Sequence, residues 1–415
     1  SSDVCSSDLK KEIHGEMKRI SIITGSELRQ VQGVNYFIKS FLECNKLFNN
    51  VIVDRVYSSL QVLYIDKGDK MPIGADIAIK EYAIRGVRTF LRKLLTDKFY
   101  LFALFRYELN FYHNSYRSVS NYFDDNHLVD YIIFQEVGCA YYYFKLFKKF
   151  SKGNRPKTVL VIHTEDDSGS MLMNTFNGFG RKDMQRRFNK RRDFVYSNID
   201  KVIYISQKAY NNSILPVSKR SFVYNGSPDV KYTFVNKQND VIQFVCVGSF
   251  VGRKGQDKII QALKMMSDSI LKRLHVTMVG DGPELEKMKS LVTQYNLDDY
   301  VTFTGRRNDV ADILNGMDVF IMPSLVEGLP MSAIEAMRAG LYLILTDTGG
   351  NVELCAEGCG AICTREPKDV KREIINVING SVISKKQKMN SRKRFLQTFS
   401  LDSMACGYER VLTNI

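Results

Sequence analysis

Several features are missing from this chain of 415 residues, and their absence narrows the class of protein. No apolar run reaches the roughly 18 residues that a helix needs to cross a bilayer, so we expect no membrane span. We find no secretory leader, and the eight cysteines have no regular spacing. This predicts a reducing, cytoplasmic setting rather than a disulfide scaffold. Repeats and low-complexity tracts are also absent, which excludes a solenoid.

What is present is typical of a globular protein with two or more domains. Hydrophobic residues make up 44% of the chain and charged residues 25%, which are ordinary proportions. The formal net charge of +14 is not ordinary. It predicts an acidic partner, namely a nucleotide, an anionic membrane or a nucleic acid.

The C-terminal half alternates between apolar strands and helical segments. The expected strands are Gln243–Gly248, Val276–Gly280, Val301–Gly305, Asp318–Pro323 and Tyr342–Thr346. Near-continuous apolar strands that alternate with helices predict a doubly wound parallel sheet. Ligands of such sheets bind at the carboxyl ends of the strands, and the glycine-rich turns fall there.

The N-terminal half has the same character with less regularity. Its expected strands are Ile20–Thr24, Val51–Val53, Tyr131–Phe134, Val159–Ile162 and Val202–Ile205, with a long helical stretch over residues 80–122. Residues 226–240 are polar and are predicted to link the two halves. Residues 1–16 are left out of the fold prediction, because Ser1–Leu9 resembles the translation of a common sequencing adapter.

One segment, Glu327–Glu335, carries the strongest functional signal. It follows an expected strand and opens a helix, with Pro330 at the predicted first helical position and Gly340 just past the end. Two carboxylates near a helix N-terminus can both face a ligand there, and the free backbone N–H groups favour an anion. A phosphate attached to a sugar meets both requirements. An ordinary strand–turn–helix with two solvated acids would give the same segment.

Four turns should converge at one sheet edge, namely Gly248–Gly255, Gly280–Pro283, Gly305–Arg306 and Glu327–Gly328. Together they resemble the family 4 retaining glycosyltransferases, and the match extends to Gly349–Gly350 with Glu353 and to Asn225–Gly226 with Asp229. The resemblance covers residues 242–365 most strongly. It implies an α/β chain of the GT-B class, in which two Rossmann-like doubly wound domains face each other across a cleft. Residues 17–225 would bind the acceptor and 241–395 the nucleotide sugar, and a helix over 396–415 would pack back on the first domain.

The resemblance implies a role for each site residue. Lys254 would neutralise the donor diphosphate, Glu335 would accept hydrogen bonds from the ribose, and Glu327 would face the donor sugar. The remaining donor contacts would come from Gly280, Gly282, Arg306, and the amides of Gly328 and Leu329. For Lys254 and Arg306 the alternative is an exposed residue with no ligand.

Two residues of the N-terminal half match family positions. His163 ends an expected strand and would line the donor sugar and the acceptor side, although a lone histidine is more often structural. Gly33 is similar to a loop that closes over the phosphates.

Ser249 stands at a donor-binding position but departs from the family pattern, because its hydroxyl can donate one hydrogen bond and brings no charge. The family commonly has an arginine directly after the glycine of this turn, as a partner of the lysine on the diphosphate. Arg253 stands beside Lys254 and would supply the missing charge, although adjacent residues of a regular strand point to opposite sides.

We expect no metal and no cofactor other than a nucleotide sugar, UDP- or GDP-linked, as co-substrate. The Asp-x-Asp motif of metal-dependent glycosyltransferases is absent from the sequence. Cys355, Cys359 and Cys363 are evenly spaced, but the spacing fits no zinc or iron–sulfur pattern, and we interpret them as structural.

Basic and aromatic residues gather in two stretches of the N-terminal half. Residues 181–192 hold seven cations in an expected helix, and residues 90–112 mix aromatic with basic side chains. This pattern favours peripheral contact with an anionic inner-membrane surface, while a domain core and a solvated helix face are the alternatives. No nucleic-acid recognition motif accompanies the charge.

The resemblance therefore implies a metal-independent, retaining hexosyltransferase. It would move a sugar to a glycan or lipid-linked hydroxyl in surface polysaccharide synthesis. Two alternatives remain, a nucleotide-sugar epimerase of the same fold and a non-catalytic scaffold that binds nucleotide sugar or membrane. Epimer formation from donor alone would identify the first, and measured transfer to any acceptor would exclude the second.

Overall fold

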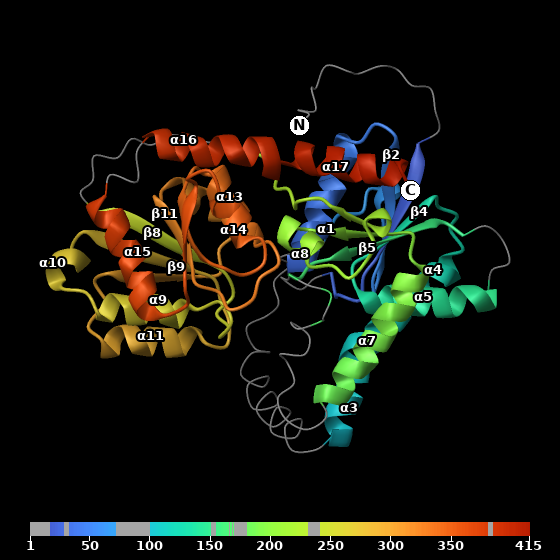
Figure 1. The fold of residues 1–415 in the computed structure, drawn as a ribbon, viewed down its shortest axis with the longest axis horizontal. Helices are drawn as coiled ribbons and strands as arrows, with labels where there is room; N and C mark the ends of the chain where they lie inside the picture. Colours follow the sequence, from blue (N-terminus) through green and yellow to red (C-terminus); the bar gives the residue numbers. More distant parts are fainter. Residues whose placement is uncertain are drawn as a thin grey trace. The chain divides into compact units, whose positions relative to one another are not determined.

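The structure is a computed structural model that describes residues 17–28, 33–71, 100–150, 155–165, 167, 169, 181–230, 241–380 and 385–415. Residues 1–16, the first part of the predicted 80–122 helical stretch, and residues 231–240 of the predicted linker lie outside these ranges. The chain divides into two compact units, shown in Figure 1. Unit 1 contains the chain up to Tyr224 together with Met404–Ile415, and unit 2 contains Asn225–Ser403.

Unit 1 is built on a seven-stranded sheet with the order β3-β2-β1-β4-β5-β6-β7. The strands are β1 (Lys18–Ile23), β2 (Val51–Tyr57), β3 (Val62–Tyr64), β4 (Tyr131–Phe134), β5 (Lys157–Ile162), β6 (Lys201–Tyr204) and β7 (Arg220–Phe222). All neighbours are parallel except β3, which runs antiparallel to β2. The short edge strands β3 and β7 were not predicted, because three residues carry too little apolar pattern to be distinguished from a loop.

Helices accompany the sheet of unit 1, and the last of them, α17, begins in unit 2. They are α1 (Gly33–Glu43), α3 (Tyr100–Glu108), a π-helical turn (Leu109–His113), α4 (Asn114–Asp125), α5 (Val137–Phe150), α7 (Arg181–Asn198), α8 (Gln207–Asn211) and α17 (Leu401–Thr413), with 3-10 turns at Cys44–Lys46, Ile65–Lys67 and Val217–Lys219. The C-terminal helix α17 packs on α1, where the ring of Tyr408 lies 4.7 Å from that of Phe41. Glu409 of α17 also accepts a hydrogen bond from the backbone N–H of Asn49 at 2.9 Å.

Unit 2 is built on a six-stranded parallel sheet with the order β10-β9-β8-β11-β12-β13. The strands are β8 (Ile242–Val247), β9 (Leu274–Val279), β10 (Val301–Gly305), β11 (Val319–Met322), β12 (Tyr342–Thr346) and β13 (Gly360–Cys363). The helices are α9 (Gln256–Lys264), α10 (Asp268–Leu271), α11 (Leu285–Gln294), α12 (Val310–Asn315), α13 (Met331–Arg338), α14 (Asn351–Cys355), α15 (Pro367–Asn379) and α16 (Lys385–Arg394), followed by a π-helical turn (Phe395–Phe399).

Both sheets are doubly wound, as predicted. In each, the strand order reverses direction once, between β1 and β4 in unit 1 and between β8 and β11 in unit 2. A reversal of this kind opens a crevice outside the carboxyl ends of the two strands, which is the usual ligand position in such sheets. The five predicted strands of unit 2 are all present, and the central residues of β8, β9, β11 and β12 are buried, whereas those of the edge strand β10 are partly or fully exposed. Among the described residues, no helix combines the length and the apolar character needed to cross a membrane.

Candidate functional site

The loops that follow β8, β11 and β12 pack backbone against backbone at the strand reversal of unit 2. Gly255, with φ of +78°, ends the first loop, and a Cβ on it would lie 2.1 Å from the carbonyl oxygen of Pro323 after β11. Gly349, with φ of +52°, follows β12, and a Cβ on it would lie 2.2 Å from the carbonyl oxygen of Gly328. Only glycine permits such approaches at these backbone angles. The three loops therefore form one packed surface.

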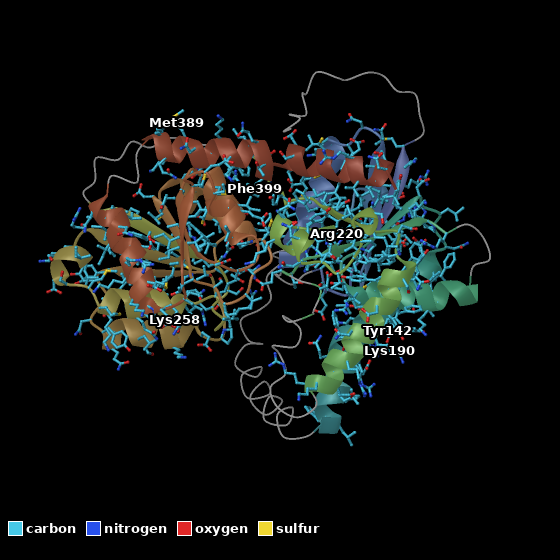
Figure 2. The ribbon with its side chains drawn as sticks, viewed as in Figure 1. Tyr142, Lys190, Arg220, Lys258, Met389 and Phe399 are labelled. Carbon is cyan, nitrogen blue, oxygen red and sulfur yellow. The ribbon has the colours of Figure 1, made fainter. Side chains whose placement is uncertain are left out.

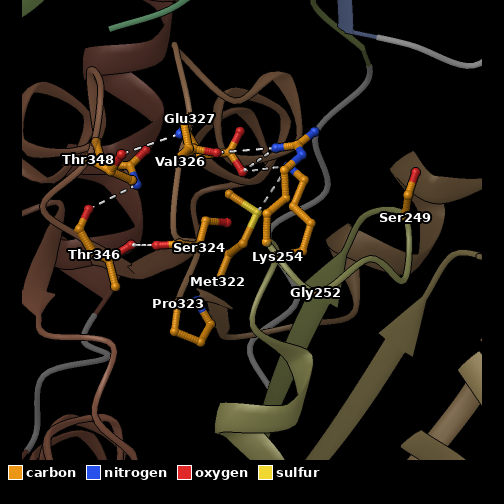
Figure 3. Close-up of polar contacts among 12 residues, drawn as sticks. Ser249, Gly252, Lys254, Met322, Pro323, Ser324, Val326, Glu327, Thr346 and Thr348 are labelled. Atoms are coloured by element: carbon orange, nitrogen blue, oxygen red, sulfur yellow. Dashed lines mark hydrogen bonds and ion pairs between the residues drawn. The ribbon is translucent and has the colours of Figure 1, made fainter. Parts of the chain in front are cut away.

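A buried ion pair joins two of these loops. The Nζ atom of Lys254 lies 2.7 Å from Oε1 of Glu327, as Figure 3 shows. The Glu327 side chain is 7% exposed and that of Lys254 is 12% exposed. The backbone N–H of Glu327 also donates to the Thr348 hydroxyl at 3.3 Å, which ties the loop after β12 to the same residue. Because β8 and β11 are neighbours at the strand reversal, the pair lies where a ligand of this sheet is expected.

Arg253 reaches the same carboxylate. Its Nη1 lies 3.2 Å from the carbonyl oxygen of Val326 and 3.4 Å from Oε1 of Glu327. The chain turns here, since the N–H of Lys254 donates to the carbonyl of Val251 at 2.9 Å. A turn removes the strand alternation that would have directed adjacent side chains to opposite sides. Arg253 and Lys254 can therefore act on one ligand, and Arg253 is the more exposed of the two, at 39%.

Ser249 does not join this cluster. Its side chain is exposed, and Figure 3 shows it set apart from Lys254 and Glu327. The Ser249 carbonyl accepts from the side chain of Gln256 at 3.2 Å, so the residue has a structural role in the loop.

The turns after β9 and β10 flank the cluster. The N–H of Gly280 donates to the carbonyl of Gly305 at 2.9 Å, and a Cβ on Gly280 would lie 2.1 Å from the carbonyl oxygen of Gly248. Gly282 packs against the backbone of Phe250 in the same way. Arg306 is exposed just beyond β10, the edge strand of the sheet. Gly280 and Gly282 therefore pack against the loop after β8, whereas Arg306 lies exposed at the edge of the sheet.

Helix α13 begins one residue later than the sequence predicted. Pro330 is the N-cap, with φ of −71° and ψ of 118°, rather than the first helical residue. The extended ψ before a helix is compatible with proline, because a cap residue has no intrahelical N–H bond to lose. Leu329 is 4% exposed, while Glu335 is partly exposed inside the helix. Gly340 has φ of +73° just past the helix, as predicted for a C-terminal glycine.

One contributor in unit 2 was missed. Arg365 donates from Nε to the carbonyl of Pro323 at 3.2 Å, and its Nη2 also donates to the carbonyl of Gly252. It therefore links the loops after β8 and β11 from a residue beyond β13. Such a contact cannot be predicted from the sequence, because every residue has a backbone carbonyl.

His163 of unit 1 follows β5 and pairs with a residue that follows β4. Its Nε2 lies 2.8 Å from Oε1 of Gln135, and its ring packs edge-on against Phe37 of α1 at 4.8 Å between centroids. The amide oxygen only accepts, so His163 donates from Nε2 and keeps Nδ1 as an acceptor. Burial lowers the pKa of His163 to about 4. The imidazole is therefore neutral at neutral pH.

Glu136 is a second residue that sequence reasoning missed. It lies at the strand reversal of unit 1, and its carboxylate accepts from Thr24 Oγ1 at 3.0 Å, Ser26 Oγ at 3.0 Å and the N–H of Gly25 at 2.9 Å. Burial raises the pKa of Glu136, and these hydrogen bonds oppose the shift. The carboxylate thus anchors residues 24–26, which directly follow β1. Gly33, predicted to belong to a loop that closes over the phosphates, is the exposed first residue of α1.

The three evenly spaced cysteines are buried free thiols. Among the described residues there is no group of three or more His, Cys, Asp or Glu side chains arranged to hold a metal ion.

Known proteins similar to this chain are glycosyltransferases. Residues 232–394 match the profile of the glycosyl transferases group 1. An uncharacterised glycosyltransferase of Methanocaldococcus jannaschii is 28% identical over 61% of this chain and 67% of its own length. The O-antigen biosynthesis glycosyltransferase WclY of Escherichia coli is 26% identical over 53% of this chain and 63% of its own length. The matches span about two thirds of the length of these relatives.

Solved structures share the fold of this chain. HepE of Anabaena, solved with UDP and glucose, superposes with a TM-score of 0.65 at 16% identity, over 96% of this chain and all of that one. The two parallel α/β sheets are those of the GT-B fold, so the predicted fold class is confirmed. The resemblance to the family 4 glycosyltransferases is therefore confirmed over residues 232–394, the part of the chain that matches the group 1 glycosyltransferases.

Proposed function

We propose that this chain transfers a hexose-type sugar from a nucleotide diphosphate sugar to a hydroxyl acceptor, with retention of the anomeric configuration. The observation that carries the proposal is the Lys254–Glu327 pair at 2.7 Å on the strand reversal of unit 2. The cation suits the diphosphate of the donor, and the carboxylate suits the hydroxyl groups of its sugar. The diphosphate needs positive charge, and the sugar hydroxyls need an acceptor.

Lys254 and Arg253 act on the leaving group in this proposal. Negative charge on the diphosphate rises as the glycosidic bond breaks, so fixed cations stabilise the transition state more than the ground state. Both side chains contact Glu327 in the structure, and its carboxylate offsets part of their positive charge before a ligand arrives. An incoming phosphate takes over these cations and leaves the Glu327 carboxylate to accept from a hydroxyl of the donor sugar.

The remaining donor contacts follow from helix α13 and the loops beside it. The amides of Gly328 and Leu329 are proposed to lie near the phosphate, and Glu335 is proposed to accept from the ribose hydroxyls. Gly280 and Gly282 give the nucleotide close access to the backbone of the β9 loop, and Arg306 approaches from the edge. A helix N-terminus favours the phosphate through its dipole.

His163 contributes a neutral group on the side of unit 1. A pKa of about 4 keeps the imidazole uncharged at neutral pH. Such a ring hydrogen-bonds sugar hydroxyls without adding charge, and we propose this role toward the donor sugar and the acceptor. In the family the displacement is thought to occur on the front face, assisted by the leaving phosphate, and we assign no protein nucleophile.

The acceptor is proposed to be a glycan or a lipid-linked sugar in surface polysaccharide synthesis. WclY acts in O-antigen biosynthesis, which supports this setting. HepE, which shares the fold, was solved with UDP and glucose, and this makes UDP-sugars the first donors to test. We also propose that the enzyme works at the surface of an anionic inner membrane and does not bind nucleic acid.

A donor screen followed by a transfer assay tests the proposal. A nucleotide sugar present at 100 times its dissociation constant adds about 2.7 kcal/mol of stability, which a thermal-shift screen detects. The stabilising donor should then be consumed only when an acceptor is present, and the reaction should persist in EDTA. Epimer formation without acceptor would favour the epimerase. Activity lost in EDTA and restored by manganese would contradict metal-independent transfer.

A further inference from the structure

A cationic pocket opens between α5 and α7 of unit 1, away from the strand ends. Its volume is about 510 Å³. The walls come from Tyr141, Lys145, Arg187, Lys190, Arg191 and Phe194, with Arg186 at the rim. Figure 2 labels Lys190 on α7 close to Tyr142 of α5. The two helices are in contact here, because the rings of Tyr141 and Phe194 lie 5.5 Å apart.

The pocket has more positive charge than its neighbours neutralise. Asp183 pairs with Arg186 at 2.6 Å and with Arg187 at 2.9 Å, and Glu108 pairs with Arg191 at 2.8 Å. Five cations against two carboxylates leave three positive charges. Lys145 and Lys190 are exposed, and neither has a carboxylate within ion-pair distance in the described part of the chain. Such a surface attracts an anion.

Aromatic rings hold the cations in place. The guanidinium of Arg191 lies 3.7 Å from the centroid of Tyr112, and both of its contacts to Glu108, at 2.8 and 2.9 Å, come from one nitrogen. The ammonium of Lys145 lies 5.1 Å from the centroid of Phe194. These cation–π contacts restrict the side chains before any ligand binds. The floor of the pocket is therefore preorganised, while Lys145 and Lys190 at its mouth stay accessible.

An exposed apolar stripe lies on the neighbouring helix. Leu101, Phe105 and Leu109 are 77%, 61% and 44% exposed. They are spaced four residues apart along α3 and into the π-helical turn, so they share one helix face. The Glu108–Arg191 ion pair holds α3 against α7, and Figure 1 shows the two helices extending together from the sheet. Apolar residues lined up beside cations are the pattern of helices that lie in a membrane interface.

We propose that α3 and α7 dock the enzyme on an anionic phospholipid bilayer. A lipid headgroup phosphate occupies the α5–α7 pocket, and the stripe formed by Leu101, Phe105 and Leu109 lies among the acyl chains. A soluble phosphate or a nucleic acid would use the cations but not the stripe, which is why the bilayer is the occupant. This docking site rests on the proposed function, which places the enzyme at an anionic membrane, and it assigns that contact to named residues and to a headgroup phosphate. Its purpose is access to a lipid-linked acceptor.

Vesicle flotation of the full chain tests the docking site without any sugar. Vesicles of equal parts phosphatidylglycerol and phosphatidylcholine should carry the protein upward, and vesicles of phosphatidylcholine alone should carry far less. The double variant Lys145→Ala/Lys190→Ala should bind anionic vesicles roughly 30-fold more weakly, because each basic residue near such a surface contributes roughly fivefold. Lys272→Ala/Lys368→Ala removes the same charge from exposed positions of unit 2 and should change nothing.

A second pair of variants tests the apolar stripe. Phe105→Ser should weaken flotation at every salt concentration, whereas Leu128→Ser, at a residue 87% exposed elsewhere in unit 1, should not. Equal binding by the pocket variant and its control would overturn the proposal, as would equal binding to neutral and anionic vesicles. Full binding by Phe105→Ser would identify a soluble anion as the occupant instead. Transfer to a water-soluble acceptor is measured in parallel, so that its failure counts against the proposed function alone.

Discussion

The two strand reversals of this molecule hold opposite kinds of polar group. In unit 2, the reversal holds a charged pair, Lys254 and Glu327. In unit 1, it holds Glu136, a carboxylate whose pKa burial raises, and the neighbouring His163 is neutral. The same backbone topology thus provides a charged site in unit 2 and, in unit 1, a site whose histidine, His163, carries no charge. A nucleotide diphosphate suits the first, and uncharged hydroxyls suit the second.

Removing the cation of the charged site should have the largest effect. Lys254→Ala leaves the buried Glu327 carboxylate without its closest partner, which costs about 3–5 kcal/mol of unfolding free energy. Turnover should also fall by about 10²–10³-fold, as for the loss of one preorganised electrostatic donor. Denaturant unfolding and steady-state kinetics measure the two effects.

The double variant Lys254→Met/Glu327→Gln separates these effects. It removes both charges, so it should recover much of the stability while activity stays low. Recovery of activity in the double variant would contradict the role of Lys254. Lys258→Ala, which disturbs a pair with Asp257 at 3.2 Å, is the control.

Arg253→Ala should have the next largest effect. Its guanidinium shares the Glu327 carboxylate with Lys254, so we expect a loss of about 2–4 kcal/mol in transition-state stabilisation, seen in kcat/KM. Stability should change little, because the side chain is 39% exposed. Ser249→Arg should recover only a small part, since Ser249 lies apart from the pair. A near-normal kcat/KM in Arg253→Ala would show that Arg253 is only a surface residue.

The uncharged histidine predicts a distinct pH dependence. The folded state holds His163 at a pKa of about 4, below the ordinary value of 6.5, so the unfolded state binds the proton first as pH falls. The contribution of His163 to stability is complete above 6.5 and is lost progressively toward pH 4, by about 3 kcal/mol. His163→Asn should flatten this part of the stability curve. Identical pH slopes in denaturant titrations of both proteins would refute the shift.

Glu335→Gln should have the smallest effect. A hydrogen bond from a ribose hydroxyl to a charged group contributes about 1.5–3 kcal/mol, so bare nucleotide should bind more weakly by that amount. Glu327→Gln should lower turnover more than nucleotide affinity. Isothermal titration with the nucleotide measures the first effect, and unchanged affinity would exclude the ribose role.

The sequence predicted the sheets better than it predicted the contacts at their ends. The bounds of β4 agree with the expected strand Tyr131–Phe134, because buried parallel strands are nearly continuous apolar runs. In contrast, β13 begins with glycine and has only one fully buried residue, Cys363, so it carries no such run.

The candidate site shows the same division. The placement of Lys254 and Glu327 on one edge follows from strand order, so their proximity was predictable. Glu136 was not found, because an acid after a strand has no pattern that reveals hydrogen bonds from a distant loop. The shared carboxylate of Arg253 and Lys254 depends on a turn whose geometry the sequence does not specify. The roles assigned to these residues stay predictions.

The strand order of unit 2 also has a consequence for synthesis. Strands β8, β9 and β10 are consecutive and can pair as soon as they leave the ribosome, but Glu327 lies 73 residues after Lys254. The ion pair forms only when β11 docks on the opposite side of β8, which closes a long loop. During translation, Lys254 is therefore exposed on a half-built sheet without its partner. A ribosome stalled before β11 would hold a nascent chain with the cations of the site but no carboxylate beside them.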